Sequence, residues 1–261
     1  MPSEWSRDWL HAEGLPEQVR GLMATRAGGV SQGACQGLNL RPVELPRATE
    51  DDPAHIRENQ RRFAAALGGA VPVYLNQVHG ADAVRLHRDR LPAPGDCPVA
   101  DASLTTDRGV ACTVLVADCL PVLLAAPEGS GVAAAHAGWR GLAGGVLERT
   151  VAALCEAAGC EPAELSAWLG ACIGPERFEV GDEVRAAFLD RPQHSTQRFR
   201  ATGTSGKWWA DLPGLARERL GHLGVRQLSG GQWCTVSDPS RFFSFRRDRD
   251  TGRHAAAIWI V

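Results

Sequence analysis

The stretch A-C-T-V-L-V-A-D-C-L-P-V-L-L-A-A at residues 111–126 decides the fold. Residues 111–119 are apolar enough to predict a strand that is buried on both faces, and Pro121 interrupts the run. Residues 122–126 then predict a second strand, and V-A-A-A-H at 132–136 predicts a third. Three short apolar strands in succession indicate a sheet at the centre of the molecule.

Helices and further strands surround this region. Four segments carry the apolar spacing of a helix: residues 54–67, 142–158, 180–189 and 211–220. In the last of these, Asp211 is the expected N-cap and Pro213 lies in the first turn. Further strands are predicted at residues 71–75, 165–173 and 255–261. Residues 190–207 read as a loop. We therefore expect an α/β protein with one domain over residues 1–261.

The composition is that of an ordinary soluble globular protein, with 44% hydrophobic and 22% charged residues. A formal net charge of −2 argues against a nucleic-acid or membrane partner, because proteins that bind such surfaces carry a basic face. Lys207 is the single lysine, so an anion site in this chain is expected to use arginine.

The eight cysteines are scattered among apolar runs, and none forms a C-x-x-C pair. The chain starts with no apolar signal segment, and no apolar stretch reaches the roughly 18 residues that would span a bilayer. We therefore expect a cytoplasmic protein with reduced cysteines. A monomer is the expected state.

Three residues with metal-binding side chains follow or end predicted strands: His79, Cys119 and His136. Taken singly, each is more often structural than a ligand. Together they place two imidazoles and one thiolate at strand ends, where ligands bind in open sheets. Three protein ligands leave a fourth position open, which is the arrangement of catalytic rather than structural zinc.

Four further motifs occur together with the sequence segments around these three residues, in a fixed order. The set comprises T-R-A-G-G-V-S at 25–31, N-Q-V-H-G at 76–80, A-D-A-S-L-T-T at 100–106, V-A-D-C-L-P-V at 116–122, A-A-A-H-A-G-W-R-G at 133–141, G-A-C-I-G-P at 170–175 and F-S-F-R-R-D-R-D-T-G-R at 243–253. With these motifs the chain resembles the YfiH-type family, also called the laccase-domain or multicopper polyphenol oxidoreductase family. Residues 41–46, R-P-V-E-L-P, depart from the family pattern.

The resemblance implies a four-layer α/β/β/α sandwich with mixed sheets, like the catalytic domain of cytotoxic necrotizing factor. It implies a zinc-dependent purine nucleoside phosphorylase that acts on adenosine, inosine and S-methyl-5'-thioadenosine, with adenosine deaminase activity. It also implies that His79, Cys119 and His136 hold Zn²⁺ and take part in catalysis. The partners would then be a purine nucleoside and phosphate.

Several residues near these motifs are candidates for substrate binding. Phosphorolysis needs an anion site, for which Arg26, Arg140 and Arg246 are candidates. Gln77 lies two residues from His79 and is a candidate contact for the purine or for water. Asp118 adjoins Cys119, but successive strand residues face opposite sides, so we expect it to be structural rather than a fourth ligand. Deamination needs an activated water, which zinc can supply.

Three other functions stay open at this point. Cys119 could be a nucleophile with His136 as its base, in an amidase that edits peptidoglycan precursors. A polyphenol oxidase is less compatible with the sequence, because the eight histidines form no H-x-H pair, although copper could still occupy a Cys/His site. The third alternative is a binding protein without enzymatic activity.

Overall fold

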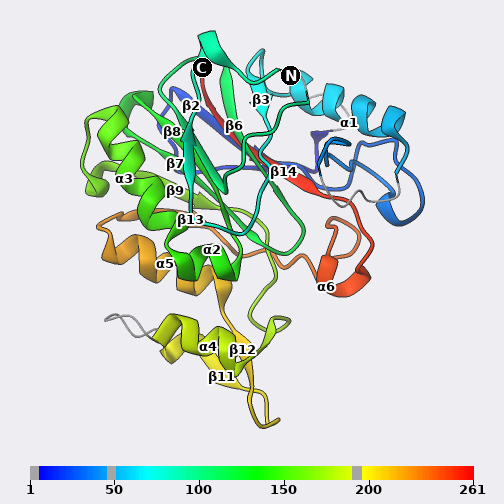
Figure 1. Ribbon diagram of the computed structural model, residues 1–261, viewed down its shortest axis with the longest axis vertical. Coiled ribbons are helices and arrows are strands. Elements are labelled where there is room, and N and C mark those ends of the chain that lie inside the picture. Colours follow the sequence, from blue (N-terminus) through cyan, green and yellow to red (C-terminus); the bar gives the residue numbers. More distant parts are fainter. Residues whose placement is uncertain (1–5, 46–50, 94, 190–195) are drawn as a thin grey trace.

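The computed structural model describes residues 6–45, 51–93, 95–189 and 196–261. Two mixed sheets lie at its centre (Figure 1). One sheet has the order β1-β2-β14-β6-β3, made of Leu10–His11, Val19–Met23, His254–Ile260, Val110–Val116 and Val71–Val73. The other has the order β13-β9-β7-β8-β5-β4, made of Gln227–Gly230, Ser166–Leu169, Leu120–Ala125, Val132–Ala137, Ala102–Thr105 and Ala83–Arg85.

The two sheets pack against each other through apolar side chains of alternate residues. Val114 of β6 and Ile258 of β14 share one buried cluster with Leu123 of β7. The neighbouring residues Ala257 and Trp259 of β14 face the opposite side, towards α1. β14 is therefore buried on both faces and lies between β2 and β6, which confirms the central strand predicted from residues 255–261.

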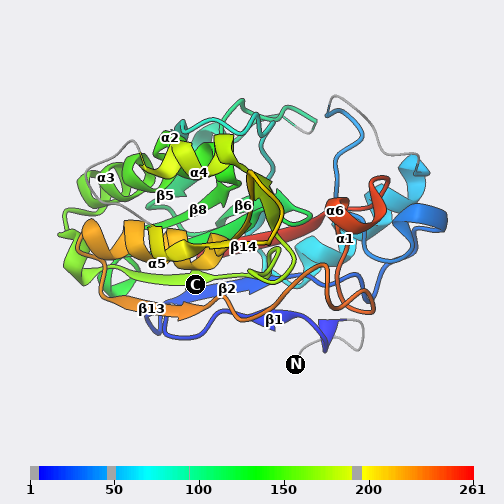
Figure 2. The same ribbon diagram turned by 90° about the horizontal axis from the view of Figure 1, so that it is seen from below.

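Helices cover the outer face of each sheet (Figure 2). Helix α1 (Pro53–Ala65) packs on the five-stranded sheet, where Phe63 joins Leu22 and Trp259. Helices α2 (Trp139–Gly144), α3 (Val146–Ala158) and α5 (Leu212–His222) pack on the six-stranded sheet. The order of layers is α/β/β/α, as expected. Asp211 caps α5, since its carboxylate accepts a hydrogen bond from the Gly214 N–H at 2.9 Å.

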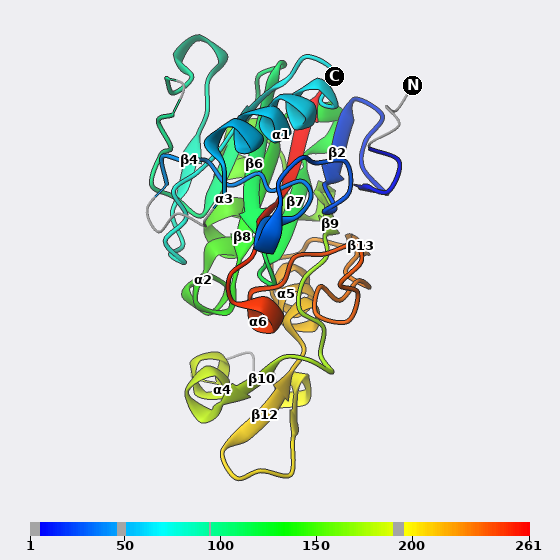
Figure 3. The same cartoon turned by 90° about the vertical axis from the view of Figure 1, so that its right-hand side faces the viewer.

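A third, small sheet projects from this sandwich beside helix α4 (Asp182–Leu189), as Figure 3 shows. It has the order β10-β12-β11, made of Glu179–Gly181, Lys207–Ala210 and Phe199–Ala201. Phe188 and Phe199 of this projection belong to the same buried cluster as α5. The short helix α6 (Phe245–Asp248) lies between the projection and the sandwich.

The structure corrects four local predictions. The helix predicted over residues 142–158 is two helices, because Gly145 adopts a left-handed conformation (φ 97°) that ends α2. The predicted helix at 180–189 begins as strand β10 and turns helical only at Asp182. Part of the predicted loop forms β11, while residues 190–195 lie outside the described residues. Pro121 does not interrupt a strand but is the second residue of β7.

Candidate metal centre and its cavity

The fold brings the three predicted metal-binding residues together at one edge of the sandwich. His79 Nε2 lies 3.9 Å from Cys119 Sγ, and the rings of His79 and His136 have centroids 4.9 Å apart. One ligand atom from each of the three residues lies within 4.8 Å of the other two. In the part of the chain that the structure describes, this is the only group of its kind.

The chain path explains why these residues meet. His79 lies between β3 and β4 and Cys119 lies between β6 and β7, so both segments cross from the five-stranded to the six-stranded sheet. His136 lies near the end of β8, opposite Pro121 of β7. His79 and Asp118 both have positive φ angles, 61° and 92°, which are unfavourable for side chains of this kind and accumulate at functional sites.

Asp118 stabilises the turn that carries Cys119. Its carboxylate accepts hydrogen bonds from Thr235 Oγ1 and from the Arg246 N–H, both at 2.6 Å. Both oxygens are therefore used in holding the turn to residues of the C-terminal segment. Asp118 therefore has the expected structural role, but the expected reason is wrong, because residues 118 and 119 lie in the turn between β6 and β7 and not in a strand.

Asp101 is the residue that joins the two histidines. Its side chain is fully buried, and Oδ1 lies 2.8 Å from His136 Nδ1. The same carboxylate accepts backbone hydrogen bonds from Val78, His79 and Gly80, at 3.2, 2.9 and 2.7 Å. One carboxylate thus fixes both the loop of His79 and the ring of His136. Asp101 lies in the A-D-A-S-L-T-T motif, but its position in the sequence alone does not indicate this role.

The charges of the site favour a thiolate beside an imidazolium when no metal is bound. Burial disfavours ionisation of Cys119, but His136 and His79 outweigh burial and lower the pKa of the thiol. Burial also disfavours the charged form of His136, yet the Cys119 charge and the hydrogen bond to Asp101 raise its pKa. Asp101 is itself buried, and hydrogen bonding to His136 and the backbone lowers its pKa.

The residues present fit a zinc ion. Tetrahedral zinc with such ligands needs donor atoms about 3.3–3.6 Å apart, slightly closer than those of His79 and Cys119. Because Asp101 occupies His136 Nδ1, the Nε2 atom is the one left to bind a metal, and carboxylate–histidine–zinc groups have this arrangement. Gly138 leaves room, since a Cβ atom there would lie 2.9 Å from Cys119 Sγ.

The three residues open on a cavity of about 910 Å³. Its lining contains four arginines and a single acidic residue, namely Arg41, Arg140, Arg249, Arg253 and Asp250. The cavity is therefore positively charged and suited to an anionic ligand. The lining also contains the apolar residues Leu45, Leu75 and Phe245.

Two of the four predicted substrate residues line this cavity and two do not. Gln77 and Arg140 are in the lining. Gln77 pairs with the backbone of Leu115, accepting its N–H at 2.7 Å and donating to its C=O at 2.8 Å. The Arg140 guanidinium lies over the Trp139 ring and makes no hydrogen bond or ion pair within the described part of the chain.

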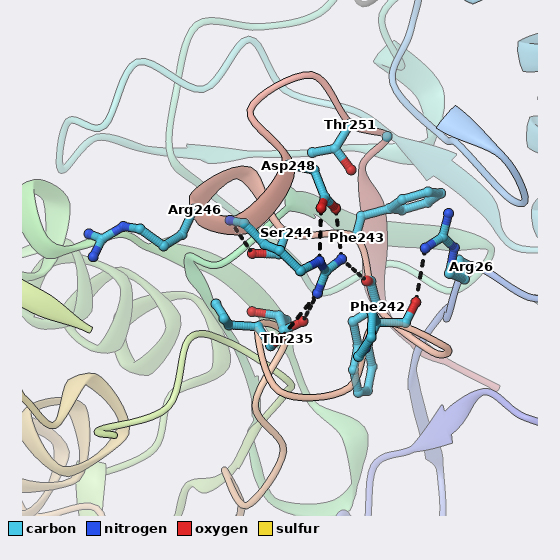
Figure 4. A network of polar contacts seen from close by, with 12 residues as sticks. Arg26, Thr235, Phe242, Phe243, Ser244, Arg246, Asp248 and Thr251 are labelled. Atoms are coloured by element: carbon cyan, nitrogen blue, oxygen red, sulfur yellow. Dashed lines mark hydrogen bonds and ion pairs between the residues drawn. The ribbon is translucent and has the colours of Figure 1, made fainter. Parts of the chain in front are cut away.

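Arg26 and Arg246 lie on opposite sides of a polar network of the C-terminal segment (Figure 4). Arg26 donates to the carbonyl oxygens of Gln36 and Pro239 and lines a separate cavity of about 470 Å³. Arg246 donates to the carbonyl oxygen of Glu179 at 2.9 Å. Both guanidiniums are thus bonded to backbone carbonyl oxygens, and neither residue lines the cavity at His79, Cys119 and His136.

The sequence of this chain matches a known protein family. The profile of the multi-copper polyphenol oxidoreductase laccase family matches residues 20–261. The chain belongs to this laccase-domain family. No helix within the described residues is long and apolar enough to cross a membrane.

Individual members of the laccase-domain family match almost the whole chain. A purine nucleoside phosphorylase of Pseudomonas aeruginosa is 45% identical, over 94% of this chain and 95% of its own. The purine nucleoside phosphorylase YfiH of Escherichia coli is 44% identical, over 94% and 96%. Among solved structures, a Neisseria meningitidis protein has a TM-score of 0.87 at 43% identity and covers 97% of this chain and 99% of its own. YlmD from Geobacillus stearothermophilus has a TM-score of 0.89 at 30% identity, covering 99% and 98%.

Proposed function

We propose that this protein is a zinc-dependent purine nucleoside phosphorylase whose active site is the cavity at His79, Cys119 and His136. The observation that carries the proposal is the opening of this metal-compatible group onto an arginine-lined cavity. The relatives at 44–45% identity that bear this activity in their names support it. Adenosine, inosine and S-methyl-5'-thioadenosine are the substrates we propose, with deamination of adenosine as a second activity.

Phosphorolysis breaks the bond between the purine and C1' of the ribose and forms a bond from C1' to a phosphate oxygen. The departing purine takes up a proton. Zinc, when bound by the two imidazoles and the thiolate, supplies a Lewis acid to the cavity. The remaining requirements are that the phosphate be held close to C1' and that the nucleoside be oriented, and these are met by side chains of the lining.

Arg140 is the phosphate-binding arginine in this proposal, in preference to Arg26 and Arg246. It lines the cavity, and its donors are not used by hydrogen bonds or ion pairs of the described residues. Gln77 can make fewer hydrogen bonds to a substrate, because its pairing with Leu115 leaves free only one N–H and one oxygen lone pair of its side-chain amide.

All eight cysteines are free thiols, which supports a reducing compartment and therefore the cytoplasm.

A second candidate function is a cysteine hydrolase, which one specific observation favours. Cys119, His136 and Asp101 follow one another as nucleophile, base and orienting carboxylate. In this alternative the thiolate attacks the amide carbon of a peptidoglycan precursor, and the amine leaves with a proton from His136. Water then hydrolyses the thioester, and no metal is needed. His79 would then have no part in the chemistry.

Metal analysis combined with an assay separates the two candidates. We expect about one zinc per chain, and phosphate-dependent release of adenine from adenosine that is lost together with zinc in Cys119→Ser. His79→Ala is the sharper variant, because it removes a zinc ligand but leaves Cys119, His136 and Asp101 in place. Full phosphorolysis by metal-free His79→Ala would refute the zinc requirement, whereas hydrolysis of an amide-containing peptidoglycan precursor by this variant would favour the hydrolase.

A further inference from the structure

One part of the cavity lining has features that phosphate binding does not explain. Four lining residues come from one short segment, and we call them the C-terminal wall: Phe245, Arg249, Asp250 and Arg253. The Phe245 side chain is 46% exposed, and it is the only aromatic residue among the exposed large hydrophobic residues of the described chain. Because this ring lies in the lining of the cavity, it offers a surface on which a planar ligand can stack.

The arginines of the C-terminal wall surround this ring. The Cζ atoms of Arg249 and Arg253 lie 5.5 and 5.9 Å from its centroid. Arg249 has a positive φ angle of 61°, a strained conformation for arginine. Its guanidinium forms no hydrogen bond or ion pair with any described residue, so it is available to a ligand.

The segment that presents Phe245 is rigidly held. Ser244 caps the short helix α6, and its Oγ accepts a hydrogen bond from the Arg247 N–H at 3.2 Å. The Arg247 guanidinium makes five hydrogen bonds, two to Asp248 and one each to the carbonyl oxygens of Thr235, Val236 and Phe242. Figure 4 shows this network around Thr235, Phe242 and Asp248. The ring is thus held in place before any ligand arrives.

We propose that Phe245 is the platform for the purine base and that Arg249 reads the edge of that base. This assignment rests on the proposed function. An aromatic ring accepts any base by stacking, whereas arginine pairs bidentately with the O6 and N7 acceptors that a 6-oxopurine presents. An adenine has an amino donor in place of O6 and offers no such pair. The C-terminal wall therefore favours inosine and guanosine over adenosine.

The platform is tested by binding, which does not require turnover. In calorimetric titrations of the zinc-loaded protein with inosine, Phe245→Ala and the aliphatic Phe245→Leu should each weaken binding by about 5- to 150-fold. Phe245→Trp should retain it. Val99→Ala is the matched control, because Val99 is 65% exposed but lies outside the cavity lining. Equal affinity in wild type and Phe245→Leu, or no binding of inosine by the wild type, would overturn the assignment.

The edge contact is tested by substrate choice. Glutamine pairs bidentately with the N6 and N7 atoms of adenine, so Arg249→Gln should shift the ratio of kcat/KM for inosine over adenosine towards adenosine by about 5- to 150-fold. An unchanged ratio would overturn the role of Arg249. If the wild type binds inosine but performs no phosphorolysis, the proposed function fails while the role of Phe245 stands. The role of Arg249 is then tested by comparing the affinities of wild type and Arg249→Gln for inosine and adenosine.

Discussion

Replacing Asp101 with asparagine tests whether one buried carboxylate organises the metal centre. The carboxylate accepts four hydrogen bonds, three from backbone N–H groups of residues 78–80 and one from His136. Asparagine keeps the shape but presents an NH₂ group where one oxygen was, so about half of these donors lose their acceptor. Hydrogen bonds to a charged group contribute about 1.5–3 kcal/mol each. We therefore expect a loss of about 3–5 kcal/mol in the free energy of unfolding.

The effect on metal binding is separate from the effect on stability. Asparagine can still contact His136 Nδ1, but it no longer supplies a negative charge behind the ring. We expect zinc affinity to fall about 10- to 100-fold, which is the usual effect of losing a carboxylate behind a zinc-bound histidine. Chelator competition measures this affinity, and urea unfolding of the metal-free protein measures the stability.

Asp82→Asn is the matched control for this substitution. Asp82 pairs with Arg149 at 2.6 Å, but its side chain is 78% exposed, so the change should cost at most about 1 kcal/mol. Zinc affinity in Asp101→Asn within about twofold of the wild type would refute the organising role of Asp101. Unchanged affinity with lower stability would limit that role to the fold.

Three further predictions concern the same region. Gly138→Ala should lower zinc content without unfolding the protein, because the added Cβ would lie 2.9 Å from Cys119 Sγ while the glycine has an ordinary φ of −65°. Arg140→Gln should lower kcat/KM for phosphate by about 10- to 100-fold, because it removes a charge-assisted hydrogen bond to phosphate. Steady-state kinetics at varied phosphate concentration measures this change. Burial lowers the pKa of His254 from 6.5 to about 3, so the unfolded chain binds a proton below pH 6.5 that the folded chain excludes. Stability should thus fall by about 2 kcal/mol from pH 7 to pH 5 in urea unfolding, and His254→Gln should remove that part of the loss.

Each of these has a control. Gly144→Ala adds the same methyl group where the nearest atom is 4.0 Å away, so it should keep its zinc. Arg140→Gln should leave inosine binding unchanged if the arginine serves phosphate alone. His222→Gln replaces an exposed histidine and should leave the pH dependence of stability as in the wild type. Equal pH dependence in His254→Gln and the wild type would contradict the argument from burial.

The central strands and the metal residues could be predicted because their signals are local. Runs of apolar residues identify β6, β7, β8 and β14. Of the candidate metal ligands, Cys119 lies in the turn between β6 and β7, His136 lies near the end of β8, and His79 lies in the loop after β3. Apolar pattern also indicates which strands are buried on both faces. Gly145 lies within a helical pattern of apolar residues. Its left-handed conformation, which divides the predicted helix into α2 and α3, could not be predicted from that pattern.

The rest of the site could not be predicted because it depends on contacts between distant segments. Asp101 acts on residues 78–80 and on His136, which only the finished fold brings near it. In the C-terminal motif, Phe245 and Arg249 face the cavity while Arg246, from the same short helix, turns to Glu179. A helix of four residues has no periodic pattern from which these directions could be read.

The position of β14 has a consequence for the synthesis of the protein. Strands β2 and β6 do not pair with each other. The inner edge of each pairs with β14, while their outer edges pair with β1 and β3. On the ribosome, the inner edges of β2 and β6 therefore wait for residues 254–260, which follow β6 by roughly 10–30 s at ordinary rates of translation. During that interval the apolar run of β6 is an open edge that can pair with another nascent chain. Chaperone demand should thus be concentrated on this interval, and substitutions that weaken β14 should reduce the yield of soluble protein more than they reduce the stability of the folded one.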